Sequence, residues 1–544
     1  MRMVYTPELR ADHPACSLEP QASKKDTPMR IRHCVIAVLL IIASSSCSNP
    51  RHVSVLHVNS IRGQIWPSEN AGALTGGFSL LSTALKEARA AAPGTPSYTV
   101  AVFNAIHGTP EAHFTDGRSI VDLMNQTGFD ALVVGPREFY FGLPALERLA
   151  KVALFPFLAA NLVQDDGTPL GFVKPFYFDP KTRVGLIGLT PRQVLSQNLE
   201  QNVRGLKVLD EVEATRSALA ELKKLGARTI GLFAGGVVWG GAPDSEDSAI
   251  AERLLDLTGI DQYWFGSPSP DREDGLEIVE RPNGPRVVMT QSGARFTNGR
   301  IIALTTFAPS PEGMTFKAIH VDNASYEPDA SLADTLYSIE SAISETMNAP
   351  VAVSGGDFSL EFESECSMGD LVVDLFRDFA KTDVFLLNTG KIRSAFKSGP
   401  INRKAVYDTL PFGGNIVTAR MTGSELIRVL NRSCTYVGNP QAGRGFLQVS
   451  GMSFSWDPSR PEMDKVLPES VRVGGKTLNP ESTYLVGTEA YIFGGGDGYI
   501  DFREMGIKQD SIVELSILNL LEAALRDLGS VIPGEGGRII TAGG

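Results

Sequence analysis

The sequence predicts a layered α/β (α+β) fold divided into two domains. Short apolar strands alternate with segments of helical spacing, a pattern typical of sheets covered by helices. The chain has 544 residues, enough for about two to four domains, and its 43% hydrophobic content supplies sizeable cores. With 21% charged residues and a formal net charge of −12, it has no basic excess with which to bind a nucleic-acid backbone.

Apolar segments in the first half have the length and composition of strands. They are Val53–Val58, Tyr98–Phe103, Ala131–Val134, Val184–Leu189 and Thr229–Phe233. Between them, Ser79–Arg89 and Val212–Leu225 have the apolar spacing of helices, and Gly226 stands where a glycine commonly ends one. This half therefore predicts a sheet-and-helix domain over residues 47–325.

A single acidic helix is predicted near Ser325–Ala349, with Pro328 before it and Pro350 after it. We interpret residues 326–350 as a connector and residues 351–544 as a second α/β domain. The elements expected there are a helix at Leu371–Ala380, a strand at Val384–Leu387, a helix at Ser424–Asn431 and a C-terminal helix near Ser511–Leu528.

The N-terminus predicts export. Residues 29–46 carry a basic flank, an apolar run too short to span a bilayer and then small residues, as in a secretory signal peptide. Small residues directly before Cys47 resemble a bacterial lipobox, which implies lipidation of Cys47. An uncleaved anchor and an ordinary cleaved signal are the alternatives. Residues 1–28 are interpreted as a mis-assigned start, and Ser48 favours the outer membrane of the envelope.

Five cysteines are too few for a disulfide scaffold, and no CxxC pair indicates a zinc ribbon. Cys366 and Cys434 follow Cys47. In an oxidising compartment they form either a disulfide or two buried thiols.

Short motifs in the second domain resemble the C-terminal domain of the 5′-nucleotidase family. In order they are Glu365-Cys366-Ser367-Met368-Gly369, Asn388-Thr389-Gly390-Lys391-Ile392-Arg393, Leu410-Pro411-Phe412-Gly413-Gly414-Asn415, Gly445-Phe446-Leu447-Gln448-Val449-Ser450-Gly451 and Gly494-Gly495-Gly496-Asp497-Gly498-Tyr499. Their shared order over more than a hundred residues makes the resemblance specific.

This resemblance implies a nucleotide- or nucleoside-like ligand. By match, Asn388 and Arg393 belong to the substrate site, Phe412 and Tyr491 sandwich the base, and Asp497 accepts from ribose hydroxyls. A guanidinium fork suits phosphate oxygens. Phe362 departs from the family, because relatives commonly place another phosphate-binding Arg there, so a nucleoside or another ring stays open as the ligand.

The first domain is similar to the calcineurin-like metallophosphatase domain of the same family, whose Asp, His and Asn side chains hold two metals. The frame is Leu56-His57-Val58-Asn59, Gly63, Gly76-Gly77, Gly108-Thr109-Pro110, Gly135, Glu138-Phe139, Gly142 and Asn161. At the family's metal positions the chain has Ser60, Arg62, Asn104, Pro136, Ala234, Ser267 and Ser269, and at its catalytic positions Arg137 and Tyr140. Only Asn104 keeps a ligand type.

Histidine placement supports this conclusion without an alignment. The chain has seven histidines, and none lies between His113 and His320, although the resemblance requires several imidazoles there. No metal, no other cofactor and no catalytic residue is therefore expected. His57, His107 and His113 lie near strand ends and are interpreted as structural. Arg62 and Arg137 either bind an anion or pair with acids such as Glu138.

Three functions stay open. The leading hypothesis is an envelope lipoprotein of the 5′-nucleotidase family that has lost its di-metal centre and binds a nucleotide or nucleoside, with an unidentified envelope protein as a further candidate partner. The second is an active periplasmic phosphohydrolase of nucleotide catabolism that uses other ligands. The third is a purely structural envelope protein, which would bind no nucleoside.

Overall fold

The computed structural model describes residues 52–70, 72–237, 246–266, 275–280, 286–292, 300–307, 314–411, 413–439 and 444–542. Cys47, the signal segment, Phe412, Ser267 and Ser269 lie outside these ranges. Among the described residues, no helix has both the length and the apolar content needed to cross a bilayer.

Two sheets form the centre of the first domain. Within the described residues, one has seven strands in the order β17 (Ala318–His320), β16 (Arg300–Phe307), β1 (Val53–Asn59), β4 (Ser97–Val102), β5 (Ala131–Val133), β6 (Phe157–Leu158) and β8 (Val173–Lys174). The other has six in the order β14 (Gly275–Val279), β15 (Val287–Ser292), β13 (Gln262–Gly266), β12 (Thr229–Gly235), β10 (Val184–Leu189) and β9 (Phe176–Asp179).

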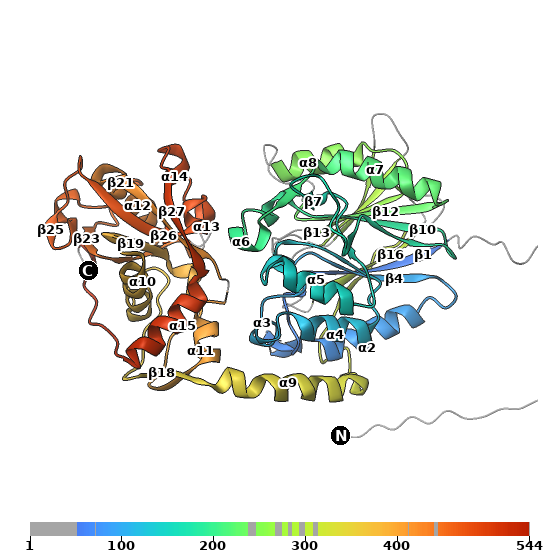
Figure 1. Ribbon diagram of the computed structural model, residues 1–544, viewed down its shortest axis with the longest axis horizontal. Helices are drawn as coiled ribbons and strands as arrows, with labels where there is room; N and C mark the ends of the chain where they lie inside the picture. The colour runs from blue at the N-terminus through green and yellow to red at the C-terminus, as the bar shows by residue number, and fades with distance from the viewer. Residues whose placement is uncertain are drawn as a thin grey trace, which may run out of the picture. The chain divides into compact units, whose positions relative to one another are not determined.

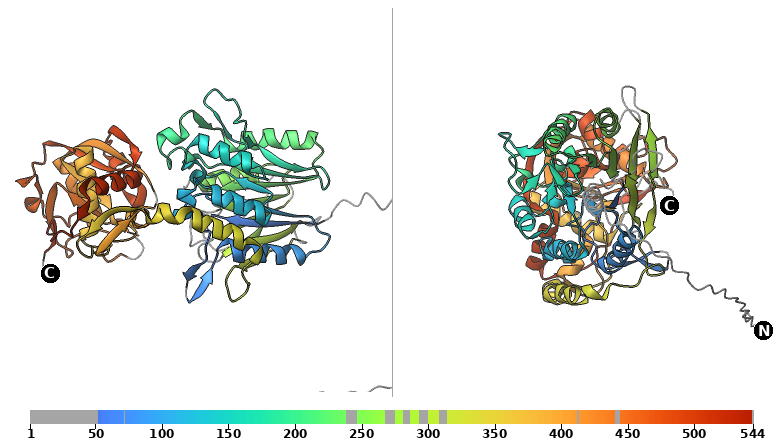
Figure 2. Two further views of the ribbon diagram at one scale, coloured as in Figure 1. Left: turned by 60° about the horizontal axis from the view of Figure 1, so that its bottom comes forward. Right: turned by 90° about the vertical axis from the view of Figure 1, so that its right-hand side faces the viewer.

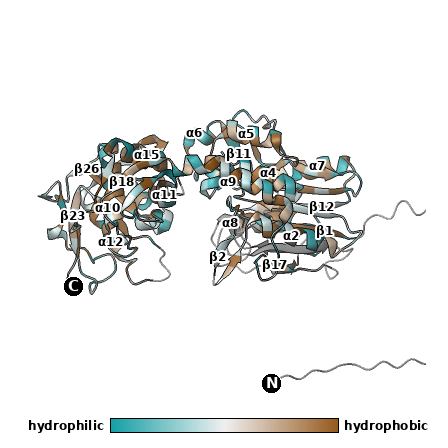
Figure 3. Cartoon of the chain, turned by 90° about the horizontal axis from the view of Figure 1, so that it is seen from below, coloured by the Kyte–Doolittle hydropathy of each residue, from teal (hydrophilic) through white to brown (hydrophobic). Residues whose placement is uncertain are grey.

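Helices cover the outer faces of both sheets, which gives the four layers of this domain (Figures 1 and 2). On one side lie α2 (Phe78–Ala90), α3 (Pro110–Phe114), α4 (Arg118–Thr127) and α5 (Leu143–Val152). On the other lie α7 (Glu211–Lys224) and α8 (Glu246–Leu255). Helix α4 shows how such a helix buries one apolar side: Ile120 and Met124 pack into the core, and Arg118 stays at the surface. In Figure 3 this helix alternates between hydrophobic residues in brown and hydrophilic residues in teal.

An apolar layer lies between the two sheets, and the parallel strands beside it end at one edge. Val100 and Val133 from one sheet meet Leu186, Phe233 and Trp264 from the other. Strands β1, β4 and β5 run parallel in adjacent positions. Their carboxyl ends therefore lie at one edge of the sheet, where open α/β sheets commonly bind ligands.

The second domain follows α9 (Ala333–Asn348). Its central sheet has the order β22 (Leu447–Ser450), β19 (Val384–Asn388), β26 (Thr483–Glu489), β21 (Asn415–Thr422) and β27 (Gln509–Ser516). Smaller sheets contain β18 (Pro350–Ser354), β20 (Gly399–Asn402), β28 (Ser530–Val531), β23 (Met452–Trp456), β24 (Arg472–Val473), β25 (Lys476–Thr477) and β29 (Ile539–Thr541). The helices are α10 (Ser367–Ala380), α11 (Arg403–Thr409), α12 (Gly423–Cys434), α13 (Ala490–Phe493), α14 (Asp501–Glu504) and α15 (Ile517–Leu528).

Two helices were predicted to begin too early. The connector helix α9 starts at Ala333, after a short 3-10 turn at Ala330–Leu332, instead of near Ser325. The C-terminal helix starts at Ile517, because Gln509–Ser516 pairs with β21 as a strand. The Ser516 hydroxyl accepts from the backbone N–H of Asn519, a helix-starting contact that fixes the boundary.

Candidate ligand-binding site

The loops after β1 and β4 hold non-glycine residues in left-handed backbone. Ser60, Arg62, Phe103 and Asn104 have φ angles of 54°, 53°, 64° and 57°. Such conformations cost of order 1–3 kcal/mol each and are concentrated at functional sites. The backbone N–H of Arg62 donates to the Asn104 carbonyl at 2.8 Å. Gly108 packs so closely that a Cβ there would lie 2.2 Å from the Arg62 carbonyl oxygen.

The buried carboxylate of Glu138 ties these loops to the loop after β5. It accepts backbone N–H groups from Asn104 at 3.1 Å, Ala105 at 2.5 Å, Ile106 at 3.1 Å and Gly135 at 2.7 Å. Burial raises the pKa of Glu138, and the four donors oppose that rise. Glu138 therefore holds the strand ends together, with its oxygens directed at backbone.

Asn104, the one residue with a ligand-type side chain among the metal positions that the resemblance implies, has its side-chain oxygen engaged. That oxygen accepts from the backbone N–H of Arg137 at 3.0 Å. Pro136 and Ala234 are buried and carry no side-chain ligand atom. The Ser60 hydroxyl donates to the Asn59 side-chain oxygen at 3.4 Å.

Three histidines of this domain, His57, His107 and His113, lie among aromatic residues. His57 is buried between the sheets, with its ring 6.0 Å from that of Phe233, and burial lowers its pKa to about 3. His107 stacks on Tyr140 at 3.5 Å, and burial, followed by the charge of Arg137, lowers its pKa. The ring centre of His113 lies 5.9 Å from that of His107. Burial, followed by the charge of Arg403, lowers the pKa of His113 to about 4.

These residues do not fit a pair of metal ions. Within the described ranges, no three His, Cys, Asp or Glu side chains are grouped so that they could hold a metal. The side chains of Arg62 and Arg137 place fixed positive charge at the same strand ends, and guanidinium is not a metal ligand. The residues present thus disagree with the metal centre that the fold resemblance implies.

A cavity of about 440 Å³ brings together seven of the candidate residues. Residues after β1 and β5 line it together with residues of the second domain. The lining residues are Arg62, Arg137, Tyr140, Ser196, Gln197, Asn198, Leu199, Asn202, Asn388, Gly390, Lys391, Arg393, Gly414, Asn415, Glu489, Ala490, Tyr491 and Asp497. Of the five predicted substrate-site residues, Asn388, Arg393, Tyr491 and Asp497 thus meet in one cavity.

Asp497 is the centre of a polar cluster in that cavity. Its carboxylate accepts from the side-chain amide of Asn388 at 2.5 Å and from the Tyr491 hydroxyl at 2.9 Å. The Tyr436 hydroxyl donates to the Asp497 backbone carbonyl. The side-chain oxygen of Asn388 is buried without a hydrogen-bond partner in the described structure, so the cluster presents an unused acceptor.

A buried ion pair borders this cluster. Lys391 Nζ lies 3.2 Å from Glu489 Oε1, and the other Glu489 oxygen accepts from the Tyr491 backbone N–H at 3.0 Å. A Cβ at Gly414 would lie 2.2 Å from Glu489 Oε1. The missing side chain at Gly414 therefore leaves room for the pair, which fixes the backbone from which Tyr491 projects.

Arg444 is a candidate that the sequence did not single out. Its guanidinium carbon lies 3.9 Å from the ring centre of Phe362, the residue at which the resemblance led us to expect an Arg. Burial, followed by the charge of Arg444, lowers the pKa of Arg393, whereas Asp497 raises it. A second guanidinium thus lies near Arg393 although position 362 is aromatic. The sequence pattern did not indicate this role of Arg444, because its contact with Phe362 joins positions far apart in the chain.

Both remaining cysteines are buried free thiols, which decides between the two alternatives. Burial raises the pKa of both, that of Cys434 to about 12. Neither is therefore a reactive thiolate near neutral pH.

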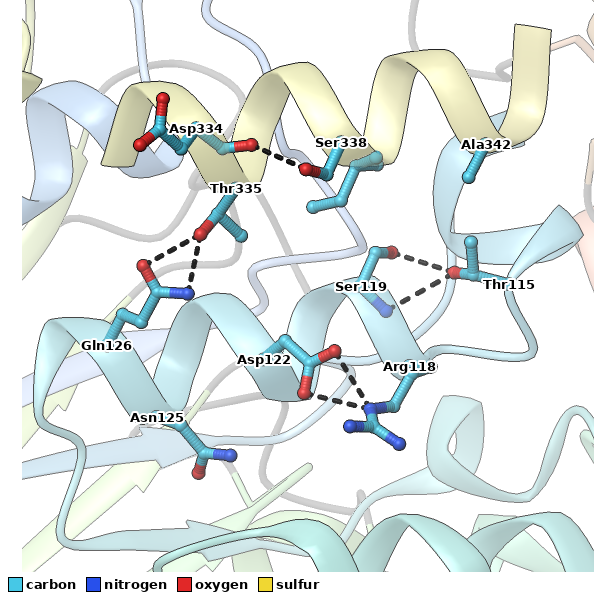
Figure 4. A pocket seen from close by; sticks show the side chains of 11 residues that line it. Thr115, Arg118, Ser119, Asp122, Asn125, Gln126, Asp334, Thr335, Ser338 and Ala342 are labelled. Atoms are coloured by element: carbon cyan, nitrogen blue, oxygen red, sulfur yellow. Dashed lines mark hydrogen bonds and ion pairs between the residues drawn. The ribbon is translucent and has the colours of Figure 1, made fainter. Parts of the chain in front are cut away.

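A separate cavity of about 590 Å³ lies between α4 and α9 (Figure 4). Its polar side chains bond to one another: Arg118 to Asp122 at 2.8 Å and Gln126 to Thr335 at 2.7 Å. None of the predicted site residues lines this cavity between α4 and α9.

Comparison with known proteins assigns the fold. Residues 345–504 match the family described as 5′-nucleotidase, C-terminal domain. A 5′-nucleotidase of Vibrio parahaemolyticus is 24% identical over 523 residues, which cover 86% of this chain and 90% of the relative.

Solved structures agree along nearly the whole chain. The 5′-nucleotidase precursor of Thermus thermophilus has a TM-score of 0.61 at 23% identity and covers 91% of this chain and 100% of its own. A putative 5′-nucleotidase of Staphylococcus aureus, solved with alpha-ketoglutarate, has a TM-score of 0.69 at 17% identity, with 90% and 99% covered. The predicted two-domain α/β fold is confirmed. The chain is therefore a homologue of the 5′-nucleotidases, with their two-domain fold and a 5′-nucleotidase C-terminal domain over residues 345–504.

Proposed function

We propose that this homologue binds a nucleotide or nucleoside and does not hydrolyse it. The observation that carries the proposal is the polar cluster of Asn388, Tyr491 and Asp497, which lines the cavity and has a buried, unused acceptor on Asn388. A buried acceptor without a partner is costly, and a ligand donor would satisfy it.

The chemistry of the cluster suits a ribose and a base. A carboxylate has about four acceptor sites, and two donors from Asn388 and Tyr491 occupy part of that capacity at Asp497. The remaining sites fit ribose hydroxyls. The Tyr491 ring is 51% exposed, which suits stacking on a base. In this account Arg393 supplies a phosphate contact, and Phe412, the other residue expected to stack on the base, lies outside the described residues.

Loss of hydrolysis follows from the strand ends. Two-metal hydrolysis requires side chains that hold both ions and a water activated between them. Here the side-chain oxygen of Asn104 accepts from the Arg137 backbone N–H, and the Glu138 carboxylate accepts from backbone N–H groups. Neither residue therefore offers its oxygens to an ion.

The proposal includes the location and the division of the chain. Cys47 would carry the lipid anchor after cleavage of residues 29–46, which would hold the protein in the bacterial envelope. Residues 47–325, 326–350 and 351–544 would be the first domain, the linker helix and the binding domain. An unidentified envelope protein is a further candidate partner.

Calorimetric titration of the purified protein with adenosine tests the binding proposal. We expect saturable binding that Asp497→Ala weakens at least about tenfold, because a charged acceptor contributes about 1.5–3 kcal/mol. Tyr491→Phe should weaken it less, since the ring is kept. Tyr337→Phe, an exposed position on α9, is the control. Absence of binding by adenosine and by its 5′-monophosphate would overturn the proposal and favour a structural role.

A further inference from the structure

The cavity at the strand ends carries a local positive charge in an acidic protein. Its charged lining residues are the cations Arg62, Arg137, Lys391 and Arg393 and the anions Glu489 and Asp497. Lys391 and Glu489 pair with each other, and among the described lining residues the cationic side chains outnumber the anionic ones. The whole chain has a formal net charge of −12, so the excess at this cavity opposes the charge of the molecule and would attract an anion.

Arg62 and Arg137 are both anchored through the segment after β4. The Arg62 backbone N–H donates to the carbonyl of Asn104, and the Arg137 backbone N–H donates to the side-chain oxygen of the same Asn104. Glu138 fixes that segment by its contacts with Asn104, Ala105 and Ile106. The backbone from which each of the two side chains projects is thus fixed before any ligand arrives, which lowers the entropic cost of binding.

The neighbouring acid Glu138 is engaged by backbone donors. Burial lowers the pKa of Arg137, which shows that its charge is held at a cost. Glu138 attracts Arg137 but directs its oxygens at four backbone N–H groups. A third cavity, of about 360 Å³, is also lined by Arg62 and Arg137. Glu111 is the one carboxylate among its described lining residues.

We propose that Arg62 and Arg137 form a metal-independent phosphate site, in which guanidiniums hold the oxyanion at the strand ends. The planar donors of arginine match phosphate oxygens in pairs. The site binds the group without activating water, because guanidinium provides neither a Lewis acid nor a base. Its ligand is a phosphate monoester or free inorganic phosphate.

The nucleotide form of this inference rests on the proposed function, since the base and ribose would occupy the second domain while the phosphate lies at Arg62 and Arg137. Arg393 lines the same cavity and would contribute a third guanidinium. The ligand would then be a nucleoside 5′-monophosphate in preference to the nucleoside.

Calorimetry in the presence of EDTA tests the site with three probes: adenosine, adenosine 5′-monophosphate and inorganic phosphate. We expect the monophosphate to bind at least about tenfold more tightly than adenosine and inorganic phosphate to compete with it. Arg62→Gln combined with Arg137→Gln should remove that preference and leave adenosine affinity unchanged. Arg118→Gln, on α4 and outside this cavity, is the matched control.

Each outcome has a defined meaning. Equal preference for the monophosphate in the wild type and the double variant would overturn the site, as would binding that EDTA abolishes. Phosphate binding that depends on Arg62, without any adenosine binding, would support the site and sink the proposed function. If the double variant does not fold, as judged by its thermal unfolding, Arg62→Gln alone and phosphate competition on the wild type replace it.

Discussion

At the scale of single residues, one buried carboxylate holds the strand ends of the first domain. The Glu138 carboxylate is engaged by backbone N–H groups of the segment Asn104–Ile106 and of Gly135. Left-handed backbone at Phe103 and Asn104 is tolerated because these contacts hold it. The residue that links three loops is therefore Glu138.

We expect Glu138→Gln to lower the free energy of unfolding by about 2 kcal/mol, since hydrogen bonds to a charged acceptor are worth about 1.5–3 kcal/mol and an amide offers one oxygen instead of two. Urea unfolding measures this. Glu147→Gln, which removes only the exposed pair with Lys151, should change stability by less than about 1 kcal/mol. Equal effects of the two substitutions would show that Glu138 does not hold the strand ends together.

The expectation that Ser60, Arg62, Pro136 and Ala234 hold no metal rests on residue type alone, because these side chains are poor metal ligands, and it stays a prediction. Sequence could not predict the role of Arg444. Its contact with Phe362 joins positions far apart in the chain, and a Gly-Arg-Gly sequence has no pattern that indicates such a contact. The same limit applies to the engagement of Asn104 by the Arg137 backbone.

At the scale of elements, helix α10 is joined to the start of strand β29 by a group of charged residues, of which Asp370 is buried. Arg538 pairs with Asp374 at 2.6 Å, and Asp370 lies 3.6 Å away from the same guanidinium. Glu365 accepts backbone N–H groups from Gly537, Arg538 and Ile539. Burial raises the pKa of Asp370 to about 7; Arg538 opposes the rise and Glu365 adds to it.

This pKa predicts a pH-dependent stability. Asp370 has a folded pKa above its unfolded value of about 4, so its protonated form stabilises the fold below pH 4, and that contribution is lost as the pH rises through about 7. Asp370→Asn should flatten the stability profile between these limits. Asp378→Asn, exposed on the same helix, should leave it unchanged. An unaltered slope in Asp370→Asn would contradict the assignment.

Element boundaries show what periodicity provides and where it fails. Strands such as Val184–Leu189 agree with the prediction residue for residue, because a buried strand between turn residues has little freedom. The predicted C-terminal helix, near Ser511–Leu528, included the last six residues of strand β27 (Gln509–Ser516). Pairing with β21 determines its state, and that partner lies far away in sequence.

At the scale of the whole molecule, the fold and the site carry different information. The two-domain architecture agrees with that of 5′-nucleotidase structures over about nine-tenths of the chain, with 91% covered in the Thermus thermophilus structure. The cavity keeps Asn388, Arg393, Tyr491 and Asp497 on one side and presents Arg62 and Arg137 on the other. A fold does not fix a function, and here the strand ends argue for capture of a ligand without turnover.

Phosphate release is the most direct test of this account. The purified protein would be incubated with a panel of 5′-nucleotides and Mn, Zn, Mg or Co, with a chelator as the reference. We predict no release above the chelator level with any metal. Metal-stimulated release that the chelator abolishes, and that Arg393→Ala also removes, would contradict the account and show that the strand ends hold a working metal centre.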